Sequence, residues 1–159
     1  MIKVTIIALG RLKEKYLTEA VKEYQKRLSR YCSLDILELE PVKLADNPSE
    51  TEINSALEKE CETILKKIPT GSKIIPLCVE GKAMSSPDFA GEINKSVNMG
   101  KSITFIIGSS HGLSERIKKI GDLRLSVSEM TFPHQLFRVM LLEQIYRAFK
   151  IIEGSAYHK

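Results

Sequence analysis

The clearest structural signal in this chain is the run SITFIIG at residues 102–108. They join β-branched and aromatic side chains in a run too short for a helix, and a glycine closes it. Such a run predicts a buried strand. Because helical patterns flank this strand along the chain, we expect it in a parallel sheet whose two faces are both covered by helices. The segment therefore predicts the α/β class.

The same alternation extends outward from this strand in both directions. Other apolar runs predict strands over residues 2–10, 33–40, 73–81 and 122–128. Helical periodicity predicts helices over residues 14–30, 49–68, 86–100, 115–120 and 133–152. Pro76 lies inside the third predicted strand, which favours an edge position or a bulge. Because no linker, repeat or low-complexity segment intervenes, we expect a single domain over residues 1–159.

The composition is that of a soluble globular protein, with 159 residues of which 43% are hydrophobic and 28% are charged. No apolar run approaches the roughly 20 residues that a helix needs to cross a bilayer. Residues 1–3 lead directly into the first strand, without the basic head and cleavage site of a signal peptide. We therefore expect a cytoplasmic protein that is neither exported nor embedded in a membrane.

The cysteines and histidines do not have the spacing of a metal site. Cys32, Cys61 and Cys78 are odd in number and far apart, and no C-x-x-C pair occurs. The three histidines are equally scattered. This pattern predicts reduced thiols and no bound metal.

A net charge of +4 permits a nucleic-acid partner without requiring one. The local excess lies in residues 10–30, where seven basic side chains outnumber three acidic ones. For the helix itself, we interpret this excess of basic side chains as a solvent-exposed helix face. Arg11 and Lys13, which precede that helix, are kept as candidate contacts to RNA.

Three turns follow the predicted strands at the edge of the sheet where ligands of α/β proteins bind. They are CVEGKAMSS at residues 78–86, GSSHGLS at 108–114 and SVSEMTFPH at 126–134. The second turn is rich in glycine, which lets a ligand approach the backbone. It matches neither G-x-G-x-x-G nor a Walker loop, so neither a nicotinamide dinucleotide nor ATP is indicated.

The second turn also fits G-x-S-x-G, the pattern of a serine hydrolase. Ser110 would then be the nucleophile, His134 its base and Asp122 the residue that orients the imidazole. Five-residue patterns of this kind arise often by chance. A serine hydrolase is therefore kept as the alternative enzyme, with the triad as its hypothesis.

The last helix, at residues 133–152, carries apolar side chains in nearly every direction. A helix that is apolar all round must be covered all round. The domain's own sheet covers one side, so we expect a second copy of the chain to cover the other, most simply in a two-fold homodimer. Glu143 and Arg147 have the spacing of a favourable helical ion pair. Alternatively, Arg147 is a cation beside a ligand pocket.

The chain ends in GSAYHK, after a glycine that stops the helix. Tyr157 and His158 could stack on nucleobases, and Lys159 could contact phosphate. A frayed end is the alternative interpretation. Tyr157 and Lys159 are therefore further candidate contacts to RNA.

Four segments of this sequence closely resemble the RlmH family of ribosomal large-subunit methyltransferases, which belongs to the SPOUT class. They are residues 130–159, the GRLKEKY segment at 10–16, the EGK segment at 80–82, and FIIGSSHGLS at 105–114. The resemblance covers essentially the whole chain. It implies an enzyme dependent on S-adenosyl-L-methionine that methylates N3 of a pseudouridine in 23S rRNA of the assembled ribosome.

The resemblance also implies the architecture and the cofactor site. The fold would be a three-layer parallel-sheet domain with a C-terminal trefoil knot, working as a homodimer with its pocket at the subunit interface. The cofactor would lie against Leu77, Gly108, Val127, Ser128, Glu129, Met130, Thr131 and Phe132. Where the family commonly has Gly-Gly, this chain has Gly108-Ser109. If the second position needs a positive φ, Ser109 would cost about 1 kcal/mol.

Catalytic roles follow from the chemistry that the resemblance implies. The imide N–H of pseudouridine is weakly acidic, so a nearby cation or base would assist methyl transfer. Arg147 is the candidate cation, and His158 or His134 the candidate base. A non-catalytic ribosome-binding factor is the third interpretation of the chain.

Overall fold

The computed structural model describes residues 1–158, with their side chains through residue 157. Its strands are β1 (Ile2–Leu9), β2 (Cys32–Leu39), β3 (Lys73–Ala83), β4 (Ile103–Ile107) and β5 (Leu125–Ser126). Its helices are α1 (Lys15–Leu28), α2 (Glu50–Leu65), α3 (Ser86–Asn98), α4 (Glu115–Ile120), α5 (His134–Ile152) and the 3₁₀ turn η1 (Ala156–His158). No helix among these residues is long and apolar enough to span a bilayer.

The five strands form one parallel sheet in the order β2-β1-β4-β3-β5. The strand β4, predicted from residues 102–108, lies in the middle of this sheet, and all five of its residues are buried. The prediction of an α/β fold with a parallel sheet is therefore confirmed.

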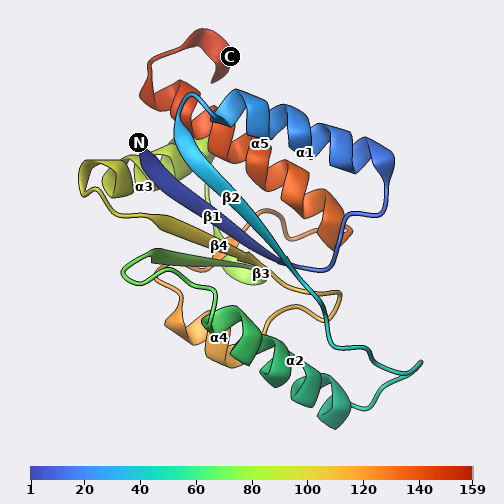
Figure 1. Ribbon diagram of the computed structural model, residues 1–159. Coiled ribbons are helices and arrows are strands. Elements are labelled where there is room, and N and C mark those ends of the chain that lie inside the picture. Colours follow the sequence, from blue (N-terminus) through green and yellow to red (C-terminus); the bar gives the residue numbers. More distant parts are fainter. Residues whose placement is uncertain (159) are drawn as a thin grey trace.

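Helices cover both faces of the sheet and give the molecule three layers (Figure 1). The helices α1, α3 and α5 lie on one face, where Val21, Phe89 and Ile145 pack with the strands in the larger core. The helices α2 and α4 lie on the other face, where Ile64 and Ile117 pack in a smaller core. Each helix thus buries the apolar stripe that its sequence period predicts.

The strand β3 shows how the chain accommodates Pro76. This strand lies between β4 and β5, so of the two predicted alternatives the edge position does not apply. Its pairing with β4 ends at Pro76, its pairing with β5 begins at Leu77, and the register shifts between Leu77 and Lys82. The proline therefore stands where the strand changes partner, and the predicted irregularity is confirmed.

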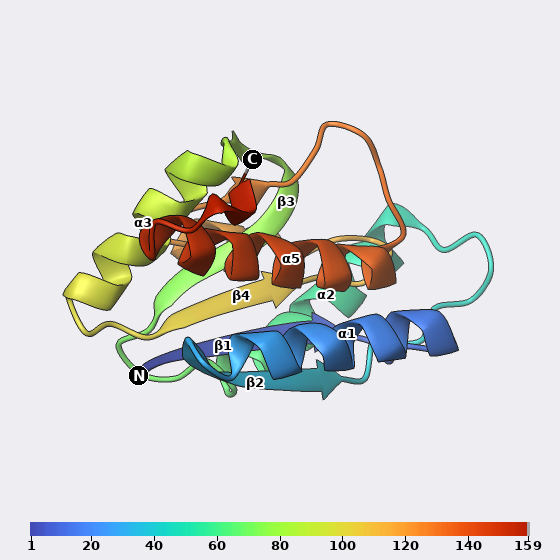
Figure 2. The same ribbon diagram turned by 90° about the horizontal axis from the view of Figure 1, so that it is seen from above.

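The helix α5 lies between α1 and α3 in the layer that covers the sheet (Figure 2). The inference that only the sheet side of this helix is covered within the chain is therefore wrong, because neighbouring helices cover both flanks as well. An outer strip of half-buried side chains remains, which includes Leu136, Met140 and Arg147. A second copy of the chain could therefore contact α5 only along this narrow strip, and not over the whole side of the helix that faces away from the sheet.

A half-buried ion pair joins α3 to the start of β3 and gives a test of the fold. Glu92 Oε2 lies 2.7 Å from Lys73 Nζ, and Glu92 Oε1 lies 2.6 Å from Lys95 Nζ. These hydrogen bonds, Lys73 first, lower the pKa of the Glu92 carboxyl from 4.5 to about 2. The pair therefore stabilises the fold fully above pH 4.5, and its contribution is lost as the pH falls towards 2.

We predict that Glu92→Gln lowers the free energy of unfolding by about 1–2 kcal/mol at pH 7. The difference from the wild-type protein should shrink as the pH falls from about 4.5 to about 2, as measured by urea denaturation at each pH. The matched control is Glu19→Gln, since Glu19 lies in an exposed pair with Lys15 and should contribute less than about 1 kcal/mol. Equal effects of the two substitutions would contradict the assignment.

Candidate functional site

A cavity of about 690 Å³ opens at the ends of β4 and β5, beside the part of β3 that follows its pairing with β4. Its walls come from the irregular second half of β3, the turns that follow β4 and β5, the start of α5, and Lys118 of α4. The residues that line it are Leu77, Cys78, Val79, Glu80, Ile107, Gly108, Ser109, Ser110, His111, Gly112, Leu113, Lys118, Leu125, Val127, Ser128, Thr131, Phe132, Pro133, His134 and Phe137. The turns that the sequence singled out therefore meet at one site, as expected for a parallel sheet.

Six of the eight residues expected at the cofactor line this cavity, and two do not. Those that line it are Leu77, Gly108, Val127, Ser128, Thr131 and Phe132. The side chains of Glu129 and Met130 are exposed and lie outside the lining, and Met130 is 72% exposed. The backbone bends there, because the Met130 N–H donates to Ser128 Oγ at 2.9 Å.

The sequence did not single out Phe137 or Lys118, which also line the cavity. The ring of Phe137 meets that of Phe132 edge to face, with centroids 5.8 Å apart. Lys118 of α4 forms an ion pair with Glu80 of β3. Helical spacing placed both residues on helices but could not indicate which side of each helix faces the sheet edge.

The turn after β4 depends on two glycines. The Gly112 N–H donates to the Ser109 carbonyl at 2.9 Å, and Gly112 has a φ of 83°. A Cβ added to Gly108 would lie 2.3 Å from the Gly112 carbonyl oxygen, which is closer than atoms can approach. The turn therefore closes only because Gly108 has no side chain.

The backbone strain considered for Ser109 is absent. Among the non-glycine residues that the structure describes, positive φ is confined to Asn47. Instead, Ser109 Oγ donates to Glu60 Oε1 at 3.2 Å, which joins the turn to α2. The serine therefore adds a contact between two elements that a glycine could not make.

We predict that Gly108→Ala destabilises the fold by about 1–3 kcal/mol, as overpacking against backbone does. The matched control is Gly91→Ala in α3, where an added Cβ meets nothing within 4 Å. That change should raise stability by up to about 1 kcal/mol, because alanine favours a helix over glycine. Urea denaturation measures both effects, and a fully stable Gly108→Ala protein would contradict the close approach.

The serine hydrolase triad is not assembled. Asp122 Oδ2 accepts the Ile74 N–H at 2.7 Å, and the Asp122 N–H donates to the Ile74 carbonyl at 2.8 Å. Ile74 pairs with Thr104 near the start of β4, whereas Ser110 follows the end of that strand. Asp122 and Ser110 therefore lie at opposite ends of the sheet, and Asp122 cannot orient His134 as the hypothesis requires.

A second cavity, of about 510 Å³, adjoins the first. The two share Ser109, Ser110, His111 and His134 as wall residues. The second cavity is further lined by Leu9, Gly10, Arg11, Lys13, Glu40, Pro41, Val42, Lys43, Leu44, Ala45, Ile53, Ala56, Leu57, Glu60 and Gln135. The site thus consists of two adjoining cavities, and His134 lines both of them.

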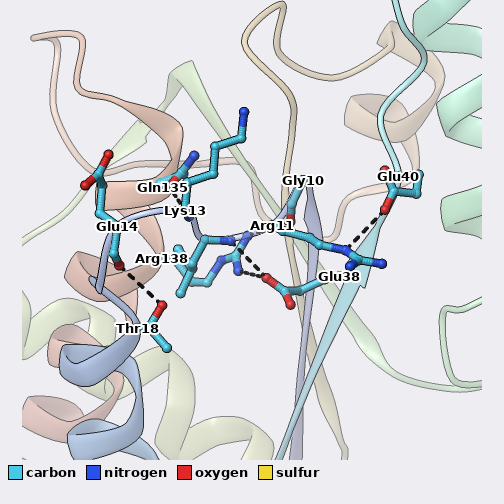
Figure 3. Close-up of polar contacts among 10 residues, drawn as sticks. Gly10, Arg11, Lys13, Glu14, Thr18, Glu38, Glu40, Gln135 and Arg138 are labelled. Carbon is cyan, nitrogen blue, oxygen red and sulfur yellow. Dashed lines mark hydrogen bonds and ion pairs between the residues drawn. The ribbon is translucent and has the colours of Figure 1, made fainter. Parts of the chain in front are cut away.

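Arg138 fixes the start of α5 against the ends of two strands (Figure 3). Its side chain is 2% exposed, and its Nη1 lies 2.6 Å from Glu38 Oε2, at the end of β2. Its Nη2 donates to the Gly10 carbonyl, just after β1, at 3.1 Å. A buried guanidinium is stable only with such partners. Arg138 therefore has a structural role in this largely apolar helix, because its charge fixes the helix to the ends of β1 and β2.

His134 lies one turn before Arg138 on α5, beside Gly10. Its Nε2 is 3.9 Å from the position that a Cβ on Gly10 would take. Burial lowers the pKa of His134 below its ordinary value, and the charges of Arg138 and Lys13 lower that pKa further. This lowered pKa favours the neutral imidazole at pH 7. The neighbouring Gln135 accepts the Lys13 N–H at 3.1 Å, which joins the loop after β1 to the same helical turn.

We predict that the pKa of His134 lies below 6.5 and rises in Arg138→Met, which removes the charge with the larger effect on that pKa and replaces it with a side chain of similar volume. The control Lys13→Ala removes an exposed charge and should raise the pKa less. Titration of the imidazole Cε1–H signal by NMR measures all three values. An unchanged His134 pKa in Arg138→Met would show that the guanidinium does not act on the imidazole.

Arg147 lies on the outer strip of α5 and lines neither cavity. Its Nη2 is 2.7 Å from Glu143 Oε1, so the predicted helical ion pair is present. Its guanidinium lies 4.9 Å from the centre of the Tyr157 ring, and the Tyr157 hydroxyl lies 3.2 Å from Glu143 Oε2. The last turn of the chain is therefore folded back onto its own helix at this point.

The remaining candidate residues are divided between the cavity rim and the chain end. Arg11 and Lys13 are exposed at the second cavity, and Arg11 Nε lies 3.2 Å from Glu40 Oε1 (Figure 3). The side chain of His158 and all of Lys159 lie outside the described residues. No group of three potential metal ligands occurs in the part of the chain that the structure describes.

Comparison with known proteins identifies the family. The model of a family described as predicted SPOUT methyltransferase matches residues 2–158. The chain is 52% identical to the ribosomal RNA large subunit methyltransferase H of Clostridium beijerinckii, over 98% of this chain and 99% of that protein. It is 51% identical to the protein of the same name from Clostridium perfringens strain 13, with the same coverage.

The chain belongs to the RlmH family of SPOUT methyltransferases. The resemblance seen in the sequence is therefore confirmed. A solved structure from Neisseria gonorrhoeae, assigned to a methylase family, is also similar, with a TM-score of 0.51. It covers 91% of this chain and 82% of that one at 10% identity, so it supports the SPOUT type of α/β fold alone.

Proposed function

We propose that this RlmH family member uses S-adenosyl-L-methionine to methylate N3 of a pseudouridine in 23S rRNA of the assembled ribosome. The observation that carries the proposal is the match, over nearly the whole chain, to proteins named ribosomal RNA large subunit methyltransferase H. The paired cavities at the sheet edge agree with it, since methyl transfer needs a donor site and an acceptor site in contact.

The larger cavity suits the proposed cofactor in size and in chemistry. Its volume of about 690 Å³ lies in the usual range for sites of small molecules and cofactors. Apolar side chains such as Leu77 and Leu125 can cover the adenine, and the turn after β4 can supply backbone hydrogen bonds. Phe132 and Phe137 line the cavity, where their rings could contact a cationic sulfonium. When bound, S-adenosylmethionine would supply a methyl group on a positively charged sulfur.

The residues of this chain would then act on the acceptor nitrogen. N3 of the base must lose its proton as it gains the methyl group, so a neutral base nearby assists. The low pKa of His134 keeps its imidazole able to take that proton, and His134 stands in the wall between the cavities. His158 is the other candidate base. Arg147 is the candidate cation that favours the deprotonated imide.

Contacts to RNA are proposed at two places. Arg11 and Lys13 line the rim of the second cavity, where they can meet phosphates. Tyr157 and Lys159 belong to the chain end, where an aromatic ring can stack on a base and a lysine can meet phosphate. Substrate shape rather than sequence reading would select the site, as the moderate net charge of +4 suggests.

The proposed assembly is a cytoplasmic homodimer of single-domain chains. The outer strip of α5 is the surface for the second copy, since Leu136 and Met140 remain half-buried there. Arg147, on the same strip, would then stand beside the partner's cavity rather than its own. We further propose that the segment after β4 is threaded as the trefoil knot that the family resemblance implies.

The test is transfer of a tritiated methyl group to ribosomes that lack the modification, followed by mapping of the labelled nucleotide. We expect one methyl group per ribosome, on N3 of a single pseudouridine. His134→Ala should slow single-turnover transfer by about 100-fold, the usual minimum for a lost base. Transfer at another atom would refute the substrate. A protein that releases no heat with S-adenosylmethionine would instead be a ribosome-binding factor.

A further inference from the structure

The second cavity has the position of an acceptor site. It meets the larger cavity along the wall formed by residues 109–111 and His134. In methyl transfer the acceptor atom, the methyl carbon and the sulfur must lie in line. The acceptor atom and the methyl carbon must also lie about 3–3.5 Å apart. An acceptor held in the second cavity and a donor held in the first would therefore come closest beside the residues that line both cavities.

The walls of the second cavity suit a nucleotide. Leu44, Ile53 and Leu57 give it an apolar side that can cover a base. Lys13 and Lys43 stand at its exposed margin, and neither has an ion-pair partner among residues 1–157. An apolar slot with basic groups at its mouth is the arrangement that holds a flipped-out base and its flanking phosphates.

A buried carboxylate faces this cavity. Glu60 is 5% exposed and lines it from α2. Its Oε2 accepts the Val42 N–H at 2.9 Å, and its Oε1 accepts from Ser109 Oγ at 3.2 Å. A carboxylate can accept about four hydrogen bonds, so these two leave capacity for a further donor. A buried charge with spare acceptor capacity favours a ligand that brings an N–H group.

We propose that the second cavity receives the pseudouridine and that Glu60 accepts the hydrogen bond of its N1–H. Pseudouridine carries N–H groups at N1 and N3, whereas N1 of uridine is bonded to the sugar and has none. With N1–H on Glu60, N3 can face the shared wall and the methyl donor. Lys13 and Lys43 hold the phosphates. The inference rests on the proposed function, and it makes Glu60 the residue that distinguishes pseudouridine from uridine.

The kinetic test compares ribosomes that carry pseudouridine at the target with ribosomes that carry uridine there. The wild-type protein should favour pseudouridine in kcat/KM by at least about tenfold, since an unpaired buried acceptor is costly. Glu60→Gln should reduce that ratio at least tenfold. Ser109→Ala removes the hydroxyl that contacts Glu60 but leaves the carboxylate, so it should keep the ratio. If Glu60→Gln keeps the ratio, or Ser109→Ala loses it equally, Glu60 only positions the turn.

The lysines are tested by a matched pair of variants. Lys43 lines the second cavity, whereas Lys59 is an exposed lysine of α2 that does not. Lys43→Ala should raise KM for ribosomes several-fold without changing the affinity for S-adenosylmethionine, and Lys59→Ala should change neither. Equal effects of the two variants would overturn the assignment of Lys43 to phosphate.

Binding of mononucleotides tests the cavity without methyl transfer. Pseudouridine 5′-monophosphate should shift the NMR signals of Leu57 and His134 at lower concentration than uridine 5′-monophosphate, and Glu60→Gln should abolish this difference. Binding elsewhere, or no preference in the wild-type protein, would refute the acceptor site. A wild-type protein that shows the preference but transfers no methyl group would refute the proposed function alone.

Discussion

The ion pair between the buried Arg138 and the partly exposed Glu38 holds the rest of the site in place. It joins the first turns of α5 to the end of β2, and its second arm reaches the Gly10 carbonyl after β1. Removing Glu38 would leave the buried guanidinium without its charged partner, which costs about 1–3 kcal/mol. Because His134 lies on the same part of α5, this pair also sets the position of the imidazole between the two cavities.

The buried Glu60, on a helix of the opposite layer, likewise joins elements that are far apart in the sequence. Its carboxylate joins α2 to the loop after β2 through Val42 and to the turn after β4 through Ser109. The two charges are carried by helices α5 and α2, whereas loops supply much of the cavity walls. Sites are commonly built in this way, on loops that a scaffold of regular elements positions.

The sequence predicted the elements well, because strands with helices between them leave a clear periodic signal. It also predicted the turns that form the larger cavity, since parallel strands end at a common edge. It could not predict Arg138, whose partners lie 100 and 128 residues away along the chain. The covering of α5 by α1 and α3 was missed for the same reason: helical periodicity shows that a face is apolar but not what packs against it.

We propose that the methyl donor occupies the larger cavity, on one side of His134. A crystal structure of the protein with bound S-adenosylmethionine would decide this. We expect the ligand against Leu77, Gly108 and Phe132, with its methyl group turned towards the wall that contains His134. A ligand bound in the second cavity, or anywhere else on the molecule, would contradict the account.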